Sequence, residues 1–167
     1  MKKLKSLQFI VLVAVILSYQ SVSAQTTIAL EDFSVLNNTS WSGTLTYSDY
    51  QSGKLVPIAT TMQVVISEKG VEQNIQYTYE PNKNIKSFTK IKKNGAYFGK
   101  QKIISKNIDS DGTVTIITSY KGKDDNRKAT LYYTYTFNTN FYKVEKEVLF
   151  DGSSKKIFRN SYEYKRI

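Results

Sequence analysis

The 167-residue chain contains no histidine and no cysteine. A chain without histidine cannot form a Ser-His-Asp or Cys-His catalytic site, a histidine-ligated haem or a zinc site of the usual kind. A chain without cysteine cannot form disulfides, so its stability must come from its core. We therefore expect a protein that is not an enzyme and that uses neither a metal nor another cofactor.

Proline and glycine are also scarce, with 2 prolines and 8 glycines in the sequence. This composition excludes collagen-like, low-complexity and linker-rich chains. The hydrophobic content of 40% is sufficient for a buried core, and the length is that of one domain.

The first residues have the three parts of a secretory signal peptide. Three lysines occur within residues 1–5, an apolar run covers residues 9–17, and Val-Ser-Ala at 22–24 provides a cleavage site. The apolar run is too short for a membrane span, which needs about 20 residues. We therefore expect cleavage after Ala24, no membrane span afterwards, and a single domain over residues 25–167 in a secreted or periplasmic bacterial protein.

Basic residues exceed acidic ones, with 24 Lys and Arg against 14 Asp and Glu. Removal of residues 1–24 takes away three lysines and no acid, which leaves a net charge of about +7. Lysines on the solvent face of a β-protein ordinarily protect its strand edges. The alternative is a cationic surface for an anionic glycan or lipopolysaccharide. Nucleic acid is not an expected partner, because single strands need exposed aromatic rings beside the cations and most aromatic residues here fall on inward faces, with the exception of Tyr50, Tyr97 and Tyr132.

From Trp41 onward, short runs rich in Val, Ile, Thr, Tyr and Phe follow one another. Turn dipeptides separate these runs, as in antiparallel hairpins. The expected strands cover residues 41–50, 56–67, 71–79, 85–92, 96–106, 113–121, 129–138, 141–150 and 155–165. The expected turns are Ser52-Gly53, Lys69-Gly70, Pro81-Asn82, Asn94-Gly95, Asp111-Gly112 and Asp151-Gly152.

Apolar and polar residues alternate within these runs, which gives each strand one apolar face. Such strands joined by short turns form an all-β, antiparallel up-and-down meander of 8–10 strands, and a long meander hides its edges by curling into a barrel. A sandwich is the alternative. A closed up-and-down barrel needs an even number of strands, whereas nine runs are counted. Residues 26–30 therefore add a tenth strand, one of the shorter runs is irregular, or the barrel has a gap. The segment Ala29–Leu36 is a helical candidate that would plug one end.

A short motif in the first expected strand is Trp41-Ser42-Gly43, followed by Leu45, Tyr47, Asp49 and Tyr50. It resembles the first strand of calycin-like barrels, the group that includes lipocalins, fatty-acid-binding proteins and nitrobindins. The Trp-x-Gly order is nearer to nitrobindins than to the Gly-x-Trp of lipocalins. The resemblance implies a meander barrel that holds a small apolar ligand. It carries over no binding residue, because the histidine that holds haem in nitrobindins is absent here.

Trp41 is expected to be a core residue, because a single tryptophan beside a glycine at the start of a strand closes the narrow end of such barrels. Gly43 is expected to help close the barrel in the same way, as a structural residue. Arg166 and Arg159 are the candidates for a cation stacked on the indole ring.

Lys146 is the principal candidate for ligand binding, because it falls between Val144 and Val148 on the apolar face of its strand. A buried ammonium group needs a carboxylate, a ligand or several hydroxyls as partners. The group would bind an anionic head group; the alternatives are a lysine that reaches solvent at the rim, or one paired with an inward acid or tyrosine. Seven tyrosines also fall on inward faces. The ligand-binding candidates among them are Tyr77, Tyr133, Tyr135 and Tyr162, and the others are Tyr47, Tyr79 and Tyr164.

Two local features affect which charged residues face the interior. Simple alternation from Phe98 would place Lys100 and Lys102 inside the barrel. We predict a β-bulge at Gly99, which shifts the phase and turns both lysines outward. Residues 124–126, Asp-Asp-Asn, are predicted to be a loop tip between two strands.

These features favour an exported, noncatalytic protein that holds a small amphipathic or apolar ligand inside a β-barrel. The alternative is a surface-binding module that recognises an anionic glycan, lipopolysaccharide or another protein through a basic face.

Overall fold

The computed structural model describes residues 26–167, so the predicted signal peptide lies outside the described residues. The described chain forms one antiparallel sheet of 11 strands and two short 3-10 helices, which confirms the all-β meander predicted from the sequence. Each of the nine predicted runs contains a strand. The elements are η1 (Leu30–Leu36), β1 (Thr39–Ser48), β2 (Leu55–Ser67), β3 (Gly70–Tyr77), η2 (Pro81–Lys83), β4 (Ile85–Thr89), β5 (Ile91–Lys92), β6 (Tyr97–Phe98), β7 (Gln101–Ile108), β8 (Val114–Asp124), β9 (Arg127–Phe137), β10 (Phe141–Phe150) and β11 (Ile157–Arg166).

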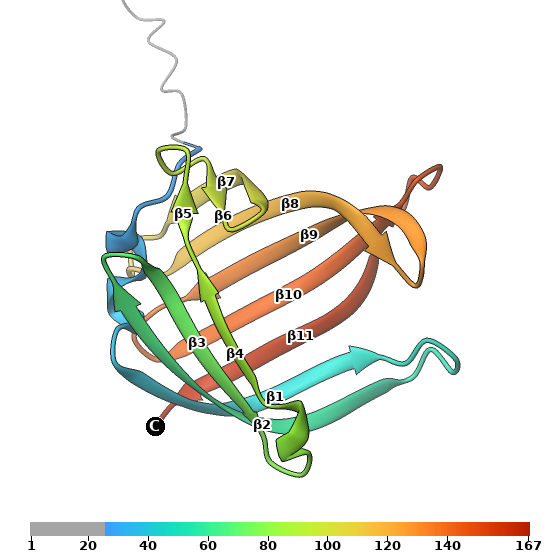
Figure 1. The fold of residues 1–167 in the computed structure, drawn as a ribbon, viewed down its shortest axis with the longest axis horizontal. Coiled ribbons are helices and arrows are strands. Elements are labelled where there is room, and N and C mark those ends of the chain that lie inside the picture. Colours follow the sequence, from blue (N-terminus) through green and yellow to red (C-terminus); the bar gives the residue numbers. More distant parts are fainter. Residues whose placement is uncertain (1–25) are drawn as a thin grey trace, which may run out of the picture.

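The sheet curls into a nearly closed barrel (Figure 1). Its strand order is β4-β3-β2-β1-β11-β10-β9-β8-β7-β6-β5, so the first and last strands of the chain are neighbours in the middle of the sheet. The two ends of the sheet, β4 and β5, are consecutive in the chain and are separated by Lys90 alone. The chain itself therefore connects the two edges, and the sandwich alternative is wrong.

The short strand β6 explains the odd number of predicted strands. The predicted run 96–106 is a hairpin rather than one strand, because Tyr97 pairs with Lys102 and Phe98 pairs with Gln101. If β4 and β5 are counted as one run, ten strands alternate in direction, and β1 and β11 can pair antiparallel as observed. The suggested strand over residues 26–30 is wrong, since no strand begins before Thr39 in the described chain.

The predicted β-bulge at Gly99 is also wrong, because this glycine lies in the turn between β6 and β7 with a φ of 62°. Such a positive φ is accessible to glycine at little cost. The turn has the effect that the bulge was expected to have: Lys100 and Lys102 are exposed, while Ile103 is only 2% exposed. The reversal of the chain at this turn, rather than an extra residue in one strand, determines which side chains of β7 face inward.

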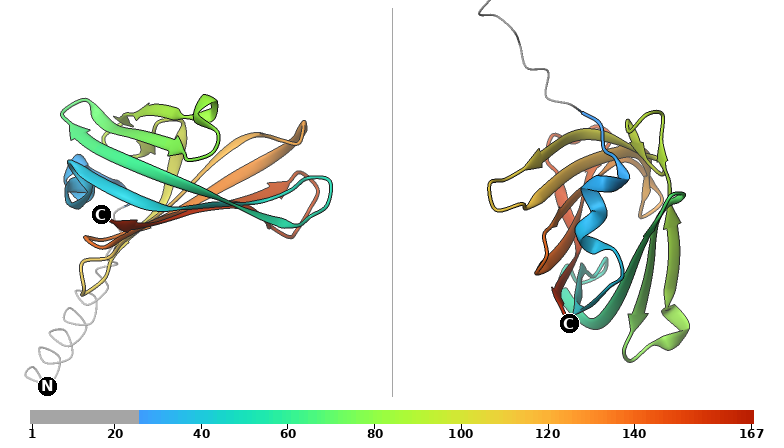
Figure 2. Two further views of the ribbon diagram at one scale, coloured as in Figure 1. Left: turned by 90° about the horizontal axis from the view of Figure 1, so that it is seen from below. Right: turned by 90° about the vertical axis from the view of Figure 1, so that its left-hand side faces the viewer.

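The helix η1 plugs one end of the barrel, as predicted (Figure 2). It buries Phe33 and Leu36. The ring of Phe33 stacks between Phe98 and Phe137, with centroid distances of 5.2 and 5.5 Å. Lys106 on β7 also holds the helix, through an ion pair of 3.0 Å with Asp32. The plug therefore closes the barrel by apolar packing together with one ion pair.

Among residues 26–167, no helix is both long enough and apolar enough to cross a membrane.

Candidate functional site

The interior of the barrel changes character along its axis. Strand register places inward side chains of β2, β1, β11, β10 and β9 in successive layers. From the plugged end outward, the layers are Thr60, Gly43, Tyr164, Tyr142 and Phe137; then Ile58, Leu45, Tyr162, Val144 and Tyr135; then Val56, Tyr47, Asn160, Lys146 and Tyr133. The four side chains of the first layer are buried, whereas every member of the third is partly exposed. The inner wall is therefore partly uncovered at the level of Lys146, whereas the next inward pair, Val148 and Leu131, is buried again.

In the half of the barrel near η1, inward tyrosines form hydrogen bonds with side chains of other strands. Tyr142 accepts a bond of 2.9 Å from Gln73, and Tyr164 accepts one of 3.1 Å from Thr60. These bonds join β10 to β3 and β11 to β2 across the interior. Within the described chain, no buried side-chain nitrogen or oxygen lacks a partner. The interior is thus amphipathic, and its buried hydroxyl groups are satisfied by the protein itself.

Three of the four predicted ligand-binding tyrosines belong to this network, and Tyr133 lies beside it. The hydroxyls of Tyr77 and Tyr162 share a bond of 2.7 Å, and Tyr135 donates one of 2.8 Å to Gln101. Tyr133 stacks on Tyr135, with ring centroids 6.4 Å apart, and is partly exposed. The inward placement predicted for Tyr79 is wrong: β3 ends at Tyr77, and Tyr79 lies in the turn before η2 with 82% of its surface exposed.

Burial changes the acidity of several inward tyrosines. It raises the pKa of Tyr164 to about 12, and it raises the pKa values of Tyr135, Tyr142 and Tyr162 still further. A tyrosine whose pKa is higher in the folded than in the unfolded state stabilises the fold. This contribution is fully present below the unfolded pKa of about 10. That contribution is lost as the pH rises through the folded value.

We expect native protein at pH 11 to show a smaller rise in absorbance at 295 nm than protein unfolded in urea. All tyrosines of the unfolded chain ionise near pH 10, whereas the buried ones of the folded chain stay neutral. The free energy of unfolding should fall over the same interval, from about pH 10 upward. Coincident titration curves for native and unfolded protein would contradict the buried tyrosine network.

Lys146 points inward, and the structure gives it a partner. Its Nζ lies 2.9 Å from Oδ1 of Asp124, and Nε of Arg159 lies 2.6 Å from Oδ2 of the same carboxylate. Tyr50 donates a hydrogen bond of 3.1 Å to Oδ1, and its ring lies 4.2 Å from the Arg159 guanidinium. We call these four residues the Asp124 cluster. Of the alternatives considered for Lys146, pairing with an inward acid is the arrangement observed.

The Asp124 cluster is buried at its centre and slightly more exposed at its cations. The Asp124 side chain is 2% exposed, compared with 10% for Arg159 and 17% for Lys146. Burial tends to raise the pKa of Asp124, but the hydrogen bonds from Lys146 and Arg159 outweigh it and hold the pKa below its ordinary value. The carboxylate is therefore ionised at neutral pH, and two cations share one anion.

Two members of the cluster were missed by sequence reasoning. The prediction of a loop tip at residues 124–126 is wrong for Asp124, which is the last residue of β8. Continuing the alternation of Thr118 and Tyr120 past the predicted strand end would have placed it inward. For Arg159, the alternation of inward and outward residues gives no comparable indication. Its register places it at an irregularity of β11, where Lys146 pairs with Asn160 and the next pair skips Arg159.

The residues predicted to close the barrel lie near η1. Trp41 is fully buried, and its indole nitrogen donates a hydrogen bond of 2.7 Å to Thr39. Arg166 pairs in register with Trp41 but does not stack on it: among the cation–π contacts of residues 26–167, none involves Trp41. The guanidinium instead donates a bond of 3.3 Å to the Thr139 carbonyl.

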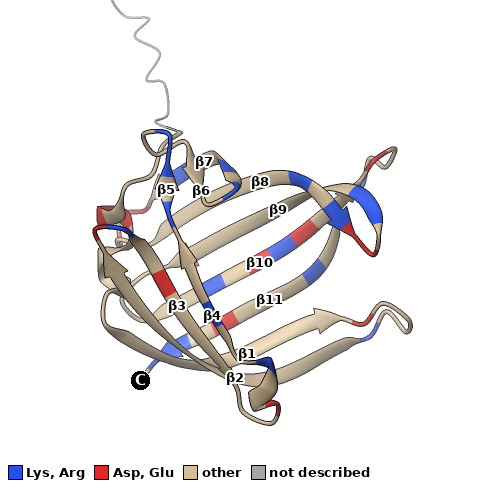
Figure 3. Cartoon of the chain, viewed as in Figure 1, with Lys and Arg blue, Asp and Glu red and all other residues tan. Residues whose placement is uncertain are grey.

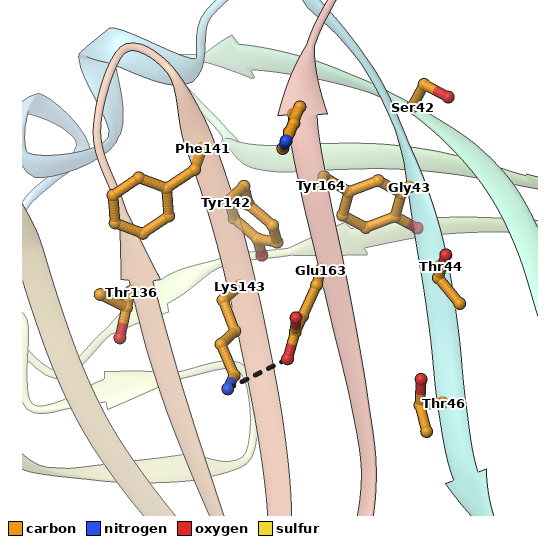
Figure 4. A pocket seen from close by; sticks show the side chains of 11 residues that line it. Ser42, Gly43, Thr44, Thr46, Thr136, Phe141, Tyr142, Lys143, Glu163 and Tyr164 are labelled. Atoms are coloured by element: carbon orange, nitrogen blue, oxygen red, sulfur yellow. Dashed lines mark ion pairs between the residues drawn. The ribbon is translucent and has the colours of Figure 1, made fainter. Parts of the chain in front are cut away.

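A groove of about 510 Å³ lies on the outer face of the sheet, over β1, β11, β10 and β9 (Figure 4). None of the predicted ligand-binding residues lines it. Threonines and the ring of Phe141 form much of its surface. Lys143 pairs there with Glu163 at 3.1 Å and with Glu145 at 3.2 Å, and the hydrogen bond to Glu163 raises the pKa of the Lys143 ammonium. This cation already has two carboxylate partners, unlike the cations of the Asp124 cluster.

Comparison with known proteins finds no matching family model, no matching curated protein and no matching solved structure.

Proposed function

We propose that this chain is an exported, noncatalytic binding protein whose barrel holds an amphipathic molecule with an anionic head group. The observation that carries the proposal is the composition of the Asp124 cluster. Lys146 and Arg159 face one carboxylate, so the cluster has one positive charge in excess. A partly desolvated positive charge attracts an anion more strongly than a charge in water does.

The two cations keep hydrogen-bonding capacity for a ligand. An ammonium group has three donors and a guanidinium group has five. Within the described chain, the side-chain hydrogen bonds of Lys146 and Arg159 are one each, both to Asp124. A carboxylate, sulfate or phosphate head group would accept charge-assisted hydrogen bonds from the remaining donors.

The wall beside the cluster suits the apolar part of such a molecule. Ile58, Val144 and Tyr162 form part of the layer that precedes Lys146 towards the plug, and all three are partly exposed although they face inward. Covering this surface with a hydrocarbon chain would remove apolar area from water, at about 25 cal/mol per Å². The ligand would therefore lie with its tail towards the tyrosine network and its head group at Lys146.

The barrel form supports the same function. A nearly closed antiparallel meander with a plug at one end is compatible with the calycin-like barrels that the Trp41-Ser42-Gly43 motif resembles. Such barrels usually hold small apolar ligands. The predicted signal peptide would place the protein in the periplasm or outside the cell, where a carrier of this kind has no need of a catalytic site.

The test is displacement of a fluorescent fatty acid by oleate, measured with wild-type protein and with Lys146→Met. We expect the substitution to weaken oleate binding about tenfold, because one charge-assisted hydrogen bond is lost. Asp124 keeps its bonds to Arg159 and Tyr50, so the variant should remain folded. The methyl ester of oleate should bind both proteins equally weakly.

Lys143→Met is the matched control, because Lys143 lies on the same strand but faces outward. It should leave oleate binding unchanged. Equal weakening by both substitutions would show a general effect of net charge, and absence of oleate binding by the wild-type protein would end the proposal.

A further inference from the structure

A second basic region follows the outer side of β8 and extends to Lys123, next to Asp124 in the chain. Two adjoining grooves, of about 420 and about 360 Å³, share Lys121 in their linings. Figure 3 shows the basic positions at the end of β8 and in the hairpin that follows. We call the two together the lysine groove. Its basic residues are Lys100, Lys102, Lys121, Lys123 and Lys128, and its acidic residue is Asp151.

The charge of the lysine groove is far less balanced than that of the whole chain. The sequence has 24 basic residues against 14 acidic ones, whereas the groove has five lysines against one aspartate. Asp151 lies 3.8 Å from Lys121, and both side chains are more than half exposed, so this pair neutralises little. The lysines come from the β6–β7 turn, β7, β8 and β9, which the fold brings to one place.

Edge protection explains only part of this arrangement. Pairing of β7 with β8 ends at Ser119, and in the described chain no strand pairs with that edge of β8 between Tyr120 and Asp124. Lysines beside such an edge hinder the addition of a strand from another protein. They also surround two hollows, and a row of cations along a hollow attracts a flexible polyanion.

The aromatic rings in the lysine groove indicate which polyanion fits. Tyr120 already stacks on Tyr133 with ring centroids 6.1 Å apart, and Lys100 Nζ lies 4.1 Å from the Tyr120 ring centre. Tyr97 is covered by Lys93 Nζ at 4.8 Å. Single-stranded nucleic acid is bound through bases that stack on accessible rings, and these rings are occupied. Recognition in the groove must therefore rely on charge.

We propose that the lysine groove binds a linear anionic polysaccharide through its acidic groups. Such a chain carries its charges along a single strand, which suits a narrow groove, and it requires no ring stacking. An exported protein would also meet polymers of this class. Lys121 and Lys123 point to the outer face of β8, opposite to the inward Asp124, and Tyr120 connects the groove to Tyr133 on the inner wall. The proposal rests on the lysines and does not depend on the function proposed above.

The test compares two triple variants of equal charge. In the groove variant, Lys100, Lys121 and Lys123 are replaced by glutamine. In the control variant, Lys54, Lys69 and Lys83 are replaced by glutamine. These three lysines are exposed and lie in the connections between strands β1, β2, β3 and β4. Binding of a polyuronate is measured for both variants and the wild type at about 50 and about 200 mM salt.

We expect wild-type protein to bind the polyuronate and to ignore uncharged dextran. The groove variant should bind about tenfold more weakly, the control variant should change less than twofold, and wild-type binding should fall about tenfold over the salt interval. Equal losses in the two variants, undiminished binding by the groove variant, or tighter binding of oligothymidylate than of polyuronate would overturn the proposal. Oleate should not compete, which separates this result from the test of the barrel interior.

Discussion

Replacing Gly43 by alanine should destabilise the barrel by about 3 kcal/mol, which is at the upper end for an overpacked site. An alanine Cβ at this position would lie 2.0 Å from the Glu163 carbonyl oxygen and 2.7 Å from Cδ1 of Tyr164. The first of these contacts is with backbone, so β1 and β11 would have to separate. The melting temperature should fall by about 6 to 12 °C.

Gly122→Ala is the matched control for this substitution. Gly122 also lies in a strand, but its added Cβ would meet Cδ1 of Leu131 at 2.8 Å and Cε2 of Tyr120 at 2.9 Å. Because both atoms belong to side chains that can rotate, we expect a loss of about 1 kcal/mol. Urea unfolding of the three proteins provides the comparison. A Gly43→Ala variant as stable as Gly122→Ala would show that β1 and β11 can accommodate a side chain there.

Replacing Asp124 by asparagine should cost about 3 kcal/mol at neutral pH. The substitution removes the carboxylate that lies between Lys146 and Arg159, and it leaves two like charges close together in a partly buried place. Asp125→Asn is the control, since Asp125 is exposed and lies 3.9 Å from Arg127. Its φ of 48° suits asparagine as well as aspartate, so the loss should stay within about 0.5 kcal/mol.

The effect of Asp124→Asn should also depend on pH. Burial opposes ionisation of Asp124, but the hydrogen bonds from Lys146 and Arg159 place its folded pKa below the ordinary value of 3.8. Its contribution to stability is therefore present above about pH 4 and is lost as the pH falls through the folded value. In unfolding measurements from pH 7 to pH 2, the wild type should approach the variant in acid. A constant difference between the two would contradict an ionised Asp124.

The strand pattern could be predicted because alternation and turn chemistry act locally. The inward direction of Lys146 followed from its neighbours Val144 and Val148, and the structure has it facing the interior. The partner of Lys146 could not be predicted in the same way. Asp124 comes from a strand whose end was placed too early, and Arg159 lies at a register irregularity that depends on pairing with β10.

The hairpin at Gly99 shows a second limit of local reasoning. Glycine at this position is compatible with a bulge or with a turn, since both use backbone conformations that other residues avoid. The pairing of β6 with both β5 and β7 selects the turn. The requirement for an even number of strands left open a tenth strand, an irregular short run or a gap. The irregular run is 96–106, which is among the longer ones.

The two ends of the sheet, β4 and β5, meet near the middle of the chain, and this position affects how the polypeptide folds. The sheet is interrupted near the middle of the chain, whereas Trp41 pairs with Arg166 near the two ends. Closure of the barrel therefore waits for the C-terminal strand, and the loop that must be closed is nearly the whole domain. Contacts so distant in sequence slow folding. Each newly made molecule consequently passes through a stage in which the edge of β1 that later pairs with β11 is open.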